Sequence, residues 1–299
     1  MMKWLVFAVV LLGQLFCAPA VFASIEDTSN IRSLYLFKDV MVSNTTAIQT
    51  SGFNSVVIFG VGIVADGGIM YYSNTPGSSD VLIASNGVYV GGDALAAKVL
   101  SLKQGTTGIN RVEISMNSQH VKDLMATPGP GPNTPLYQNF VALRTAWGLD
   151  AVNNDDESLY DLSSTITFAK MLGQMGYKYT IAPYTNAGFW SSFVQQTNSG
   201  LSEASFLIDR VYLQCYDGGA ANNPATWSGM LGLKVVPLVW VTNVSKPSQG
   251  TTAAQAETKF TTWKAQGGIT GGGYWNDYDI EKNGLSYTSY GAVLTNLFP

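Results

Sequence analysis

Short apolar runs rich in β-branched and aromatic residues recur along the chain, and stretches with helical periodicity separate most of the later ones. Residues 159–176 and 252–267 are two such helical stretches, and the second ends in the Gly-Gly pair typical of a helix terminus. Eight strands that alternate with helices predict a (β/α)8 TIM barrel. The eight predicted strands are residues 32–37, 55–64, 110–116, 147–157, 177–184, 209–216, 233–241 and 268–275.

Two gaps depart from this repeat. Residues 69–92 alternate apolar and polar positions around turn signals, which predicts a β-hairpin inserted after strand 2. Residues 125–135 are rich in proline and glycine and therefore predict an exposed loop. Both gaps lie within the repeat, so we expect residues 24–299 to form one barrel domain. An open doubly wound sheet is the alternative, although no glycine-rich dinucleotide fingerprint follows the first strand.

The amino-terminal segment has the pattern of a secretory signal peptide. Residues 1–23 combine a lysine near the start, an apolar run and a small-residue end, which predicts cleavage after Ala23. A membrane anchor is one alternative, but polar and proline residues interrupt the run short of the roughly 20 apolar residues that a span needs. Lipoprotein cleavage before Cys17 is another. We expect a secreted or periplasmic protein whose mature form does not contact a membrane.

Composition narrows the classes of function. Of the 299 residues, 46% are hydrophobic and 12% are charged, which fits a large globular core. Loss of Lys3 with the signal peptide changes the formal net charge from −4 to −5, which argues against nucleic acid as a partner. The mature chain keeps one cysteine, Cys215, and one histidine, His120, which are too few for a disulfide, a metal site or a histidine-based triad. We expect a monomer without metal or cofactor.

The fourth predicted strand ends in acidic residues. Side chains alternate along a strand, so Asn153, Asp155 and Glu157 share one face, whereas Asn154 and Asp156 share the other. The Cα atoms of Asp155 and Glu157 would lie roughly 7 Å apart, close enough for one carboxylate to raise the pKa of the other. Active sites of (β/α)8 barrels lie at the carboxyl ends of the strands. The alternative is a solvated acidic loop that caps the next helix.

Residues 150–157, DAVNNDDE, resemble the DxxDxDxE signature of glycoside hydrolase family 18, which contains chitinases and endo-β-N-acetylglucosaminidases. Asp150, Asp155 and Glu157 match the first, third and last motif positions, and Asn153 replaces the second aspartate.

The resemblance extends beyond this motif. Gln214 and Tyr216 match the Gln-x-Tyr pair that plant-type members carry on strand six, and Trp275 matches the tryptophan of the last strand. The SxGG pattern of strand three is missing, because ISMNSQ keeps only Ser115.

The resemblance implies a role for each matched residue. Glu157 would be the general acid, and the nucleophile would be the N-acetyl oxygen of the substrate itself. Asp155 would orient the acetamide and stabilise the oxazolinium ion. Tyr216 would donate a hydrogen bond to the acetamide oxygen, Gln214 would help hold the sugar, and Trp275 would form an apolar floor. Core packing at a strand end is the alternative for the two aromatic residues.

Supporting roles follow for Asn153 and Asp150. An asparagine can form hydrogen bonds but cannot share a negative charge, so the resemblance implies reduced activity or a shifted pH optimum.

Cys215 should point toward the helices as an inert core thiol. Six aromatic residues are candidates for stacking on sugar rings: Tyr71, Tyr72, Tyr184, Phe189, Trp190 and Trp227.

The sequence therefore predicts a secreted glycosidase that cleaves β-1,4 bonds of N-acetylglucosamine in chitin oligosaccharides or N-glycans. One alternative is a weakly active or inactive chitinase-like protein that only binds glycans, motivated by Asn153. The other is a barrel with unrelated hydrolase chemistry, in which Asp155 and Glu157 would lie away from Tyr216 and Trp275.

Overall fold

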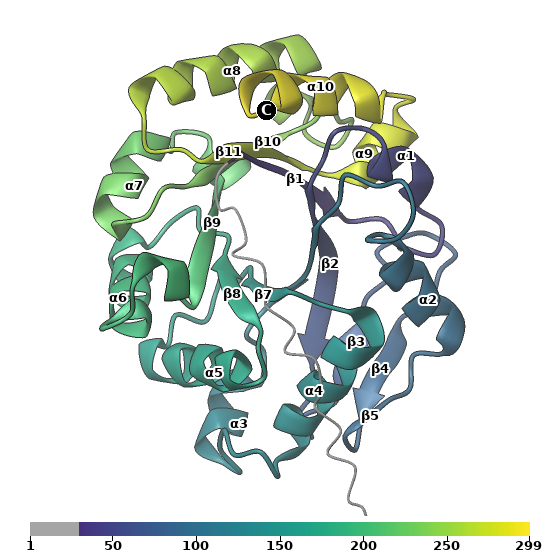
Figure 1. Ribbon diagram of the computed structural model, residues 1–299, viewed down its shortest axis with the longest axis vertical. Coiled ribbons are helices and arrows are strands. Elements are labelled where there is room, and N and C mark those ends of the chain that lie inside the picture. The colour runs from purple at the N-terminus through teal and green to yellow at the C-terminus, as the bar shows by residue number, and fades with distance from the viewer. Residues whose placement is uncertain (1–29) are drawn as a thin grey trace, which may run out of the picture.

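Eight parallel strands close into a barrel in the computed structural model, which describes residues 30–299 (Figure 1). Pairing of the first barrel strand with the second closes the ring, which excludes the open sheet and confirms the predicted (β/α)8 barrel. The predicted signal peptide, residues 1–23, lies outside the described residues. In their order around the ring the strands are β1 (Ile31–Leu36), β11 (Gly271–Trp275), β10 (Val236–Trp240), β9 (Ile208–Gln214), β8 (Lys178–Ile181), β7 (Ala151–Asn154), β6 (Arg111–Met116) and β2 (Ser55–Ile63).

Helices form a ring around the strands (Figure 1). Local sequence sets their ends: Thr252 and Gln255 form a capping box at the start of α8, as a Thr-x-x-Gln pattern favours. Among residues 30–299, none of the helices has the length and apolar character needed to cross a membrane. The helices are α1 (Thr45–Gln49), α2 (Asp93–Ser101), α3 (Val121–Ala126), α4 (Pro135–Trp147), α5 (Leu162–Gln174), α6 (Ala187–Asn198), α7 (Pro224–Leu231), α8 (Ala253–Gln266), α9 (Asp277–Lys282) and α10 (Tyr287–Leu297), with short 3-10 turns at Glu203–Ser205, Asp217–Gly219 and Pro247–Gln249.

The fourth predicted strand began too early. Trp147 is the last residue of α4, and Gly148 follows in the left-handed conformation (φ 60°) that ends many helices. The ring of Trp147 is buried against Tyr71. Trp147 is therefore a core residue of helix α4 and does not belong to a strand. Strand β7 itself spans only Ala151–Asn154.

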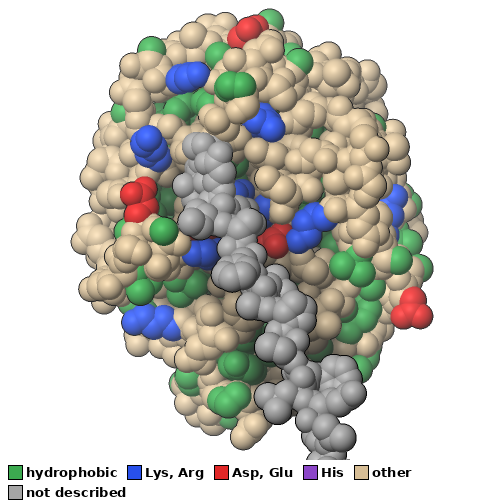
Figure 2. All heavy atoms as spheres, viewed as in Figure 1, with side chains coloured by type: hydrophobic (Ala, Val, Ile, Leu, Met, Phe, Trp, Pro, Cys, Tyr) green, Lys and Arg blue, Asp and Glu red, His purple; other side chains and the backbone are tan. Residues whose placement is uncertain are grey.

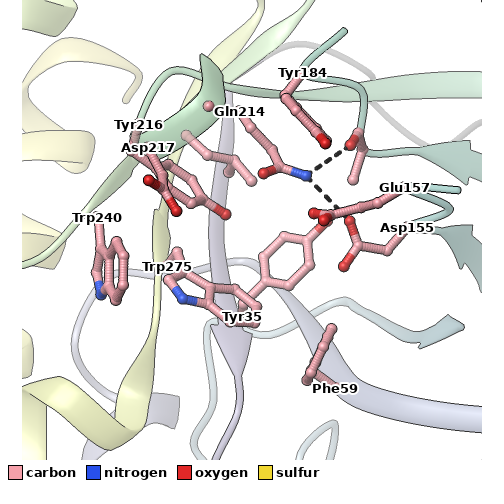
Figure 3. A pocket seen from close by; sticks show the side chains of 13 residues that line it. Tyr35, Phe59, Asp155, Glu157, Tyr184, Gln214, Tyr216, Asp217, Trp240 and Trp275 are labelled. Carbon is pink, nitrogen blue, oxygen red and sulfur yellow. Dashed lines mark hydrogen bonds between the residues drawn. The ribbon is translucent and has the colours of Figure 1, made fainter. Parts of the chain in front are cut away.

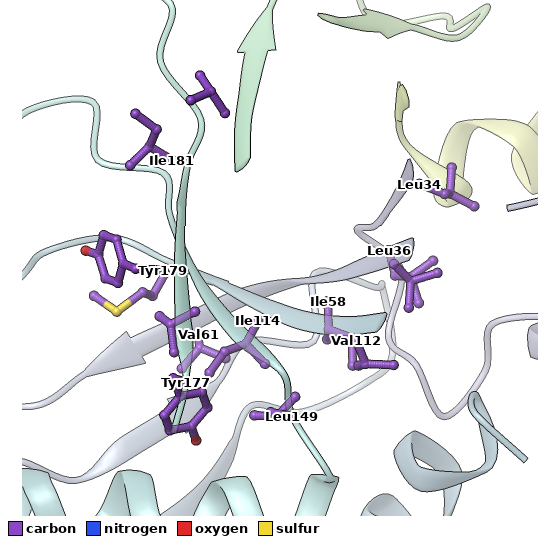
Figure 4. Close-up of a cluster of buried hydrophobic side chains, with 14 of the residues drawn as sticks. Leu34, Leu36, Ile58, Val61, Val112, Ile114, Leu149, Tyr177, Tyr179 and Ile181 are labelled. Atoms are coloured by element: carbon purple, nitrogen blue, oxygen red, sulfur yellow. The ribbon is translucent and has the colours of Figure 1, made fainter. Parts of the chain in front are cut away.

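Side-chain alternation divides the barrel strands between two apolar clusters. One face packs against the helices and includes Leu34, Ile58 and Ile114 (Figure 4). The opposite face fills the barrel interior and includes Tyr35 and Tyr212. Only inward-facing residues at the carboxyl ends of the strands can therefore reach the mouth of the barrel.

Three short antiparallel strands stand between β2 and α2, where we predicted one hairpin. They are β3 (Ile69–Tyr71), which pairs with β2, then β4 (Val81–Ser85) and β5 (Val88–Tyr89). Asn139 of α4 donates to the Gly67 carbonyl (2.7 Å) and accepts from the Gly87 amide (2.8 Å), which ties the insertion to the helix ring. Residues 127–134 separate α3 from α4 without helix or strand, a segment slightly shorter than the predicted loop of residues 125–135.

Candidate active site

A pocket of about 380 Å³ opens at the carboxyl ends of the barrel strands. Asp155 and Glu157 enter it from one side, and Tyr216 and Trp240 lie on the opposite side (Figure 3). The structure therefore brings together six of the predicted site residues: Asp155, Glu157, Tyr184, Gln214, Tyr216 and Trp275. The remaining lining residues are Tyr35, Phe59, Ala182, Asp217, Gly218, Leu238 and Trp240.

A second pocket of about 450 Å³ adjoins the first. It shares Asp155, Glu157 and Phe59 with the first pocket and extends toward Tyr72 and Ser115. The two carboxylates thus stand where the two pockets meet.

The two carboxyl groups have different surroundings. Gln214 donates its Nε2 to Asp155 Oδ1 (3.2 Å) and to the carbonyl of Ala182 (2.9 Å). Burial, followed by the charges of Glu157 and Asp156, raises the pKa of Asp155 from its ordinary 3.8 to about 7. The side chain of Glu157 is exposed. Near neutral pH, Asp155 therefore exchanges its proton readily while a second carboxyl group stands two residues away.

Two tyrosine hydroxyls face this pair. Burial raises the pKa of Tyr216 well above its ordinary value, and the negative charges of Asp155 and Glu157 raise it further. Burial and then the charge of Asp155 also raise the pKa of Tyr35. Both hydroxyls therefore stay protonated and can serve as hydrogen-bond donors.

Aromatic rings form the apolar part of the pocket. The ring of Trp275 lies 4.9 Å from that of Phe59, 5.4 Å from Phe37 and 5.6 Å from Tyr35, measured between centroids. Trp240 was not among the predicted residues. It ends the apolar run of β10 as Trp275 ends that of β11, and this position was the signal that could have identified it.

Asn153 lies beneath the pocket, completely buried inside the barrel. Its Oδ1 accepts from the Tyr35 hydroxyl (3.0 Å), and its Nδ2 donates to Thr180 Oγ1 (2.9 Å). Thr180 in turn donates to Glu113 Oε2 (2.6 Å). Sequence reasoning missed Glu113 and Arg111, although two charged residues at alternate positions of an apolar strand were a usable signal.

Asp150, which we predicted to support the site, does not line either pocket. It precedes β7, at the amino end of the strand, and its carboxylate accepts from Lys103 Nζ (2.7 Å) and the Val112 amide (2.8 Å). A carboxylate four residues before a strand's last residue lies at the opposite end of the barrel from the mouth. The role of Asp150 is to join β7 to β6 and to the segment after α2.

Several predicted sugar-stacking residues are core residues. Trp227 belongs to α7, is 5% exposed and donates its Nε1 to Asn222 Oδ1 (3.0 Å), so the prediction that it binds substrate is corrected. Tyr71 and Trp190 are each 1% exposed and pack among other apolar side chains. Tyr72 lines the second pocket. The sequence alone could not show which of these aromatic side chains point into the core and which line a pocket.

Cys215 is a buried free thiol in the cluster between the strands and the helices, as predicted. Burial raises its pKa to about 12, so it is unreactive near neutral pH. His120 is exposed just before α3. Within residues 30–299, no three histidine, cysteine, aspartate or glutamate side chains converge as ligands for a metal ion.

No protein-family model and no curated protein matches this sequence. Solved structures with a similar fold do match it. A family 18 chitinase from Crocus vernus is 12% identical, with a TM-score of 0.58 over 89% of this chain and 99% of that chain. A family 18 chitinase from Pseudoalteromonas aurantia is 11% identical, with a TM-score of 0.60 over 90% of this chain and 100% of that one. The spore cortex-lytic enzyme SleL from Bacillus cereus is 13% identical, with a TM-score of 0.58 over 90% and 74% of the two chains. The chain thus has the fold of family 18 chitinases.

Proposed function

We propose that this protein is a glycoside hydrolase that cleaves β-1,4 bonds after N-acetylglucosamine, with retention of configuration and with help from the substrate's own acetamide. One observation carries the proposal: Asp155 and Glu157 line one pocket together with Gln214, Tyr216 and Trp275. These are the residues on which the resemblance to the family rests, and they come from the ends of three different strands, β7, β9 and β11. In a barrel with unrelated chemistry, these five residues would not be expected to line one pocket.

In the proposed mechanism the exposed carboxyl group of Glu157 protonates the glycosidic oxygen. The acetamide oxygen of the sugar attacks its own anomeric carbon, and the bond to the leaving group breaks. Asp155 accepts a hydrogen bond from the acetamide N–H and stabilises the positive charge of the oxazolinium ion. Tyr216 donates to the acetamide oxygen. Water, activated by Glu157, then opens the ion and returns the enzyme to its starting state.

The position of the carboxylates supports cleavage within a glycan chain. Two pockets meet at Asp155 and Glu157, so sugars on both sides of the scissile bond have room. Trp275 and Trp240 offer rings for stacking on one side, and Tyr72 offers one on the other. Charged side chains of both signs are scattered on the face that Figure 2 shows, without one large charged patch.

We further propose that the enzyme is exported, because residues 1–23 have the signal-peptide pattern, and that it acts as a monomer on chitin oligosaccharides or N-glycans. Mass spectrometry of the products from a chitooligosaccharide and from a high-mannose glycopeptide distinguishes the two substrates. Cleavage of neither substrate between pH 4 and pH 9 would refute the proposed activity.

A Glu157→Gln variant tests the role of the general acid. We expect a loss of kcat on the order of 10²- to 10⁴-fold, since positioned proton transfer contributes about that much. Glu257→Gln is the matched control, because Glu257 is exposed on α8. A protein that only binds glycans would show equal binding and no turnover in the wild type and in both variants.

A further inference from the structure

A buried carboxylate lies inside the barrel directly beneath the candidate site. Glu113 of β6 is 0% exposed. Its Oε1 accepts from Arg111 Nε (2.7 Å) and from the Tyr212 hydroxyl (2.7 Å), and Arg210 Nη1 lies 3.9 Å away. Its Oε2 accepts from Thr180. Glu113 therefore pairs with arginine at the centre of a polar cluster.

The cluster orients the Asn153 amide. A carboxylate can only accept, so the Thr180 hydroxyl proton points to Glu113. The oxygen of Thr180 must then accept from Asn153 Nδ2, which leaves Asn153 Oδ1 to accept from Tyr35. The three hydrogen bonds therefore form a series in which each donor points toward Glu113.

Within residues 30–299, the cluster contains as many arginines as carboxylates. Arg111 forms a two-pronged ion pair with Asp209 (2.7 and 2.9 Å), and Arg210 lies beside Glu113. Two arginines thus face two carboxylates. A third carboxylate at position 153 would be buried without a matching cation, and its neighbour Thr180 would have no proton left to donate to it.

We propose that Glu113 is a positioning residue for the reaction, which holds the buried negative charge that Asn153 lacks and orients Asn153 and the Tyr35 hydroxyl through Thr180. This inference rests on the proposed function. With the Tyr35 proton directed to Asn153, the hydroxyl does not donate to Asp155, which lines the same pocket. Asp155 therefore keeps its affinity for a proton near neutral pH.

Loss of the hydrogen bonds that run through Thr180 should free the Tyr35 hydroxyl to donate to Asp155. The titratable groups that face Asp155 are Tyr35 on β1, Asp156 and Glu157 on its own segment, and Tyr216 after β9. A hydrogen bond to the charged form of an acid lowers its pKa. In Thr180→Val we expect the acidic limb of the kcat profile to move down by about one pH unit. Thr180→Ser retains the hydroxyl and should keep the wild-type profile.

If the cluster accommodates one buried negative charge at either position 113 or position 153, the two positions can exchange that charge. The variants Glu113→Gln, Asn153→Asp and the double variant test this charge exchange. Asn153→Asp alone adds an unmatched buried charge and should lower the Tm by roughly 5–10 °C at pH 8, but less at pH 5. The double variant moves the charge from position 113 to position 153 and should recover most of that loss. Additive effects of the two substitutions on Tm would overturn the exchange.

The two proposals fail in different ways. Thermal unfolding needs no substrate, so the coupling between positions 113 and 153 is measured even if no glycan is cleaved. Absence of cleavage refutes the proposed function, whereas additive unfolding or an unchanged pH profile in Thr180→Val refutes the positioning role. Recovery of Tm in the double variant, together with the shift of the pH profile, supports it.

Discussion

Replacing Asp155 with asparagine should stabilise the protein at neutral pH while it impairs the proposed reaction. The structure raises the pKa of this carboxyl group from 3.8 to about 7 through burial and through the charges of Glu157 and Asp156. For a completely dry group this rise corresponds to about 4 kcal/mol, at about 1.4 kcal/mol per tenfold change in acid dissociation. Asp155 is only partly buried, so we expect about 1–2 kcal/mol after solvent screening.

The sign follows from the direction of the shift. The folded protein binds the Asp155 proton more tightly than the unfolded chain does, so stability is fully present below about pH 4 and is lost as the pH rises to about 7. The Asp155→Asn variant has no such loss. Its free energy of unfolding should match that of the wild type near pH 4 and exceed it by about 1–2 kcal/mol at pH 8, a Tm difference of about 3–6 °C.

Thermal unfolding of both proteins at intervals from pH 4 to pH 8 measures this difference. Asp277 also has a pKa raised to about 7, chiefly by burial, but it is present in both proteins and cancels. Glu257→Gln serves as the control for removing a surface charge. In parallel, kcat of Asp155→Asn should fall on the order of 10²-fold, because an amide cannot carry the charge that stabilises the oxazolinium ion. Unfolding curves that run parallel across this pH range would refute the reasoning.

Three further predictions concern the same region. Tyr216→Phe removes one donor and should lower kcat by about 10- to 100-fold with a smaller change in KM, measured by steady-state kinetics on a chitooligosaccharide; an equal change in both would contradict a role in the transition state. Trp275→Ala removes a ring packed against Phe59 and Phe37 and should cost about 3–5 kcal/mol in denaturant unfolding; a cost below about 1 kcal/mol would show that this packing is dispensable. Cys215 should react with a thiol reagent only after denaturant is added, because it is buried and its pKa is about 12; rapid labelling of the native protein would be inconsistent with the structure.

The barrel could be predicted because apolar strand segments alternate regularly with helical segments along the sequence. Each parallel strand is apolar on the face that meets the helices, and each apolar run was recognisable without knowledge of its neighbours. Boundaries were harder to predict: Trp147 continues the apolar pattern toward β7 but ends α4, because only the left-handed turn at Gly148 separates the two elements. Asp155 and Glu157 were recognisable in the same way, since their spacing places both at the end of a strand.

The contacts that residues make across the barrel were not predictable. Trp240 and Trp275 look alike in sequence, and only their common approach to one pocket shows that both line it. Trp227 looked equally suitable, but its place in α7 turns it into the protein core. The link from Glu113 to Asn153 joins residues on different strands through Thr180, so no local pattern contains it.

The sequence by itself determined the eightfold repeat, the inward alternation of side chains and the acidic end of β7, because these depend on the order of neighbours along the chain. Only the tertiary structure decided which carboxyl group is buried, which rings face the pocket and how the charge of Glu113 is matched. These properties depend on solvent exclusion and on distances between strands, and they arise only when the barrel closes.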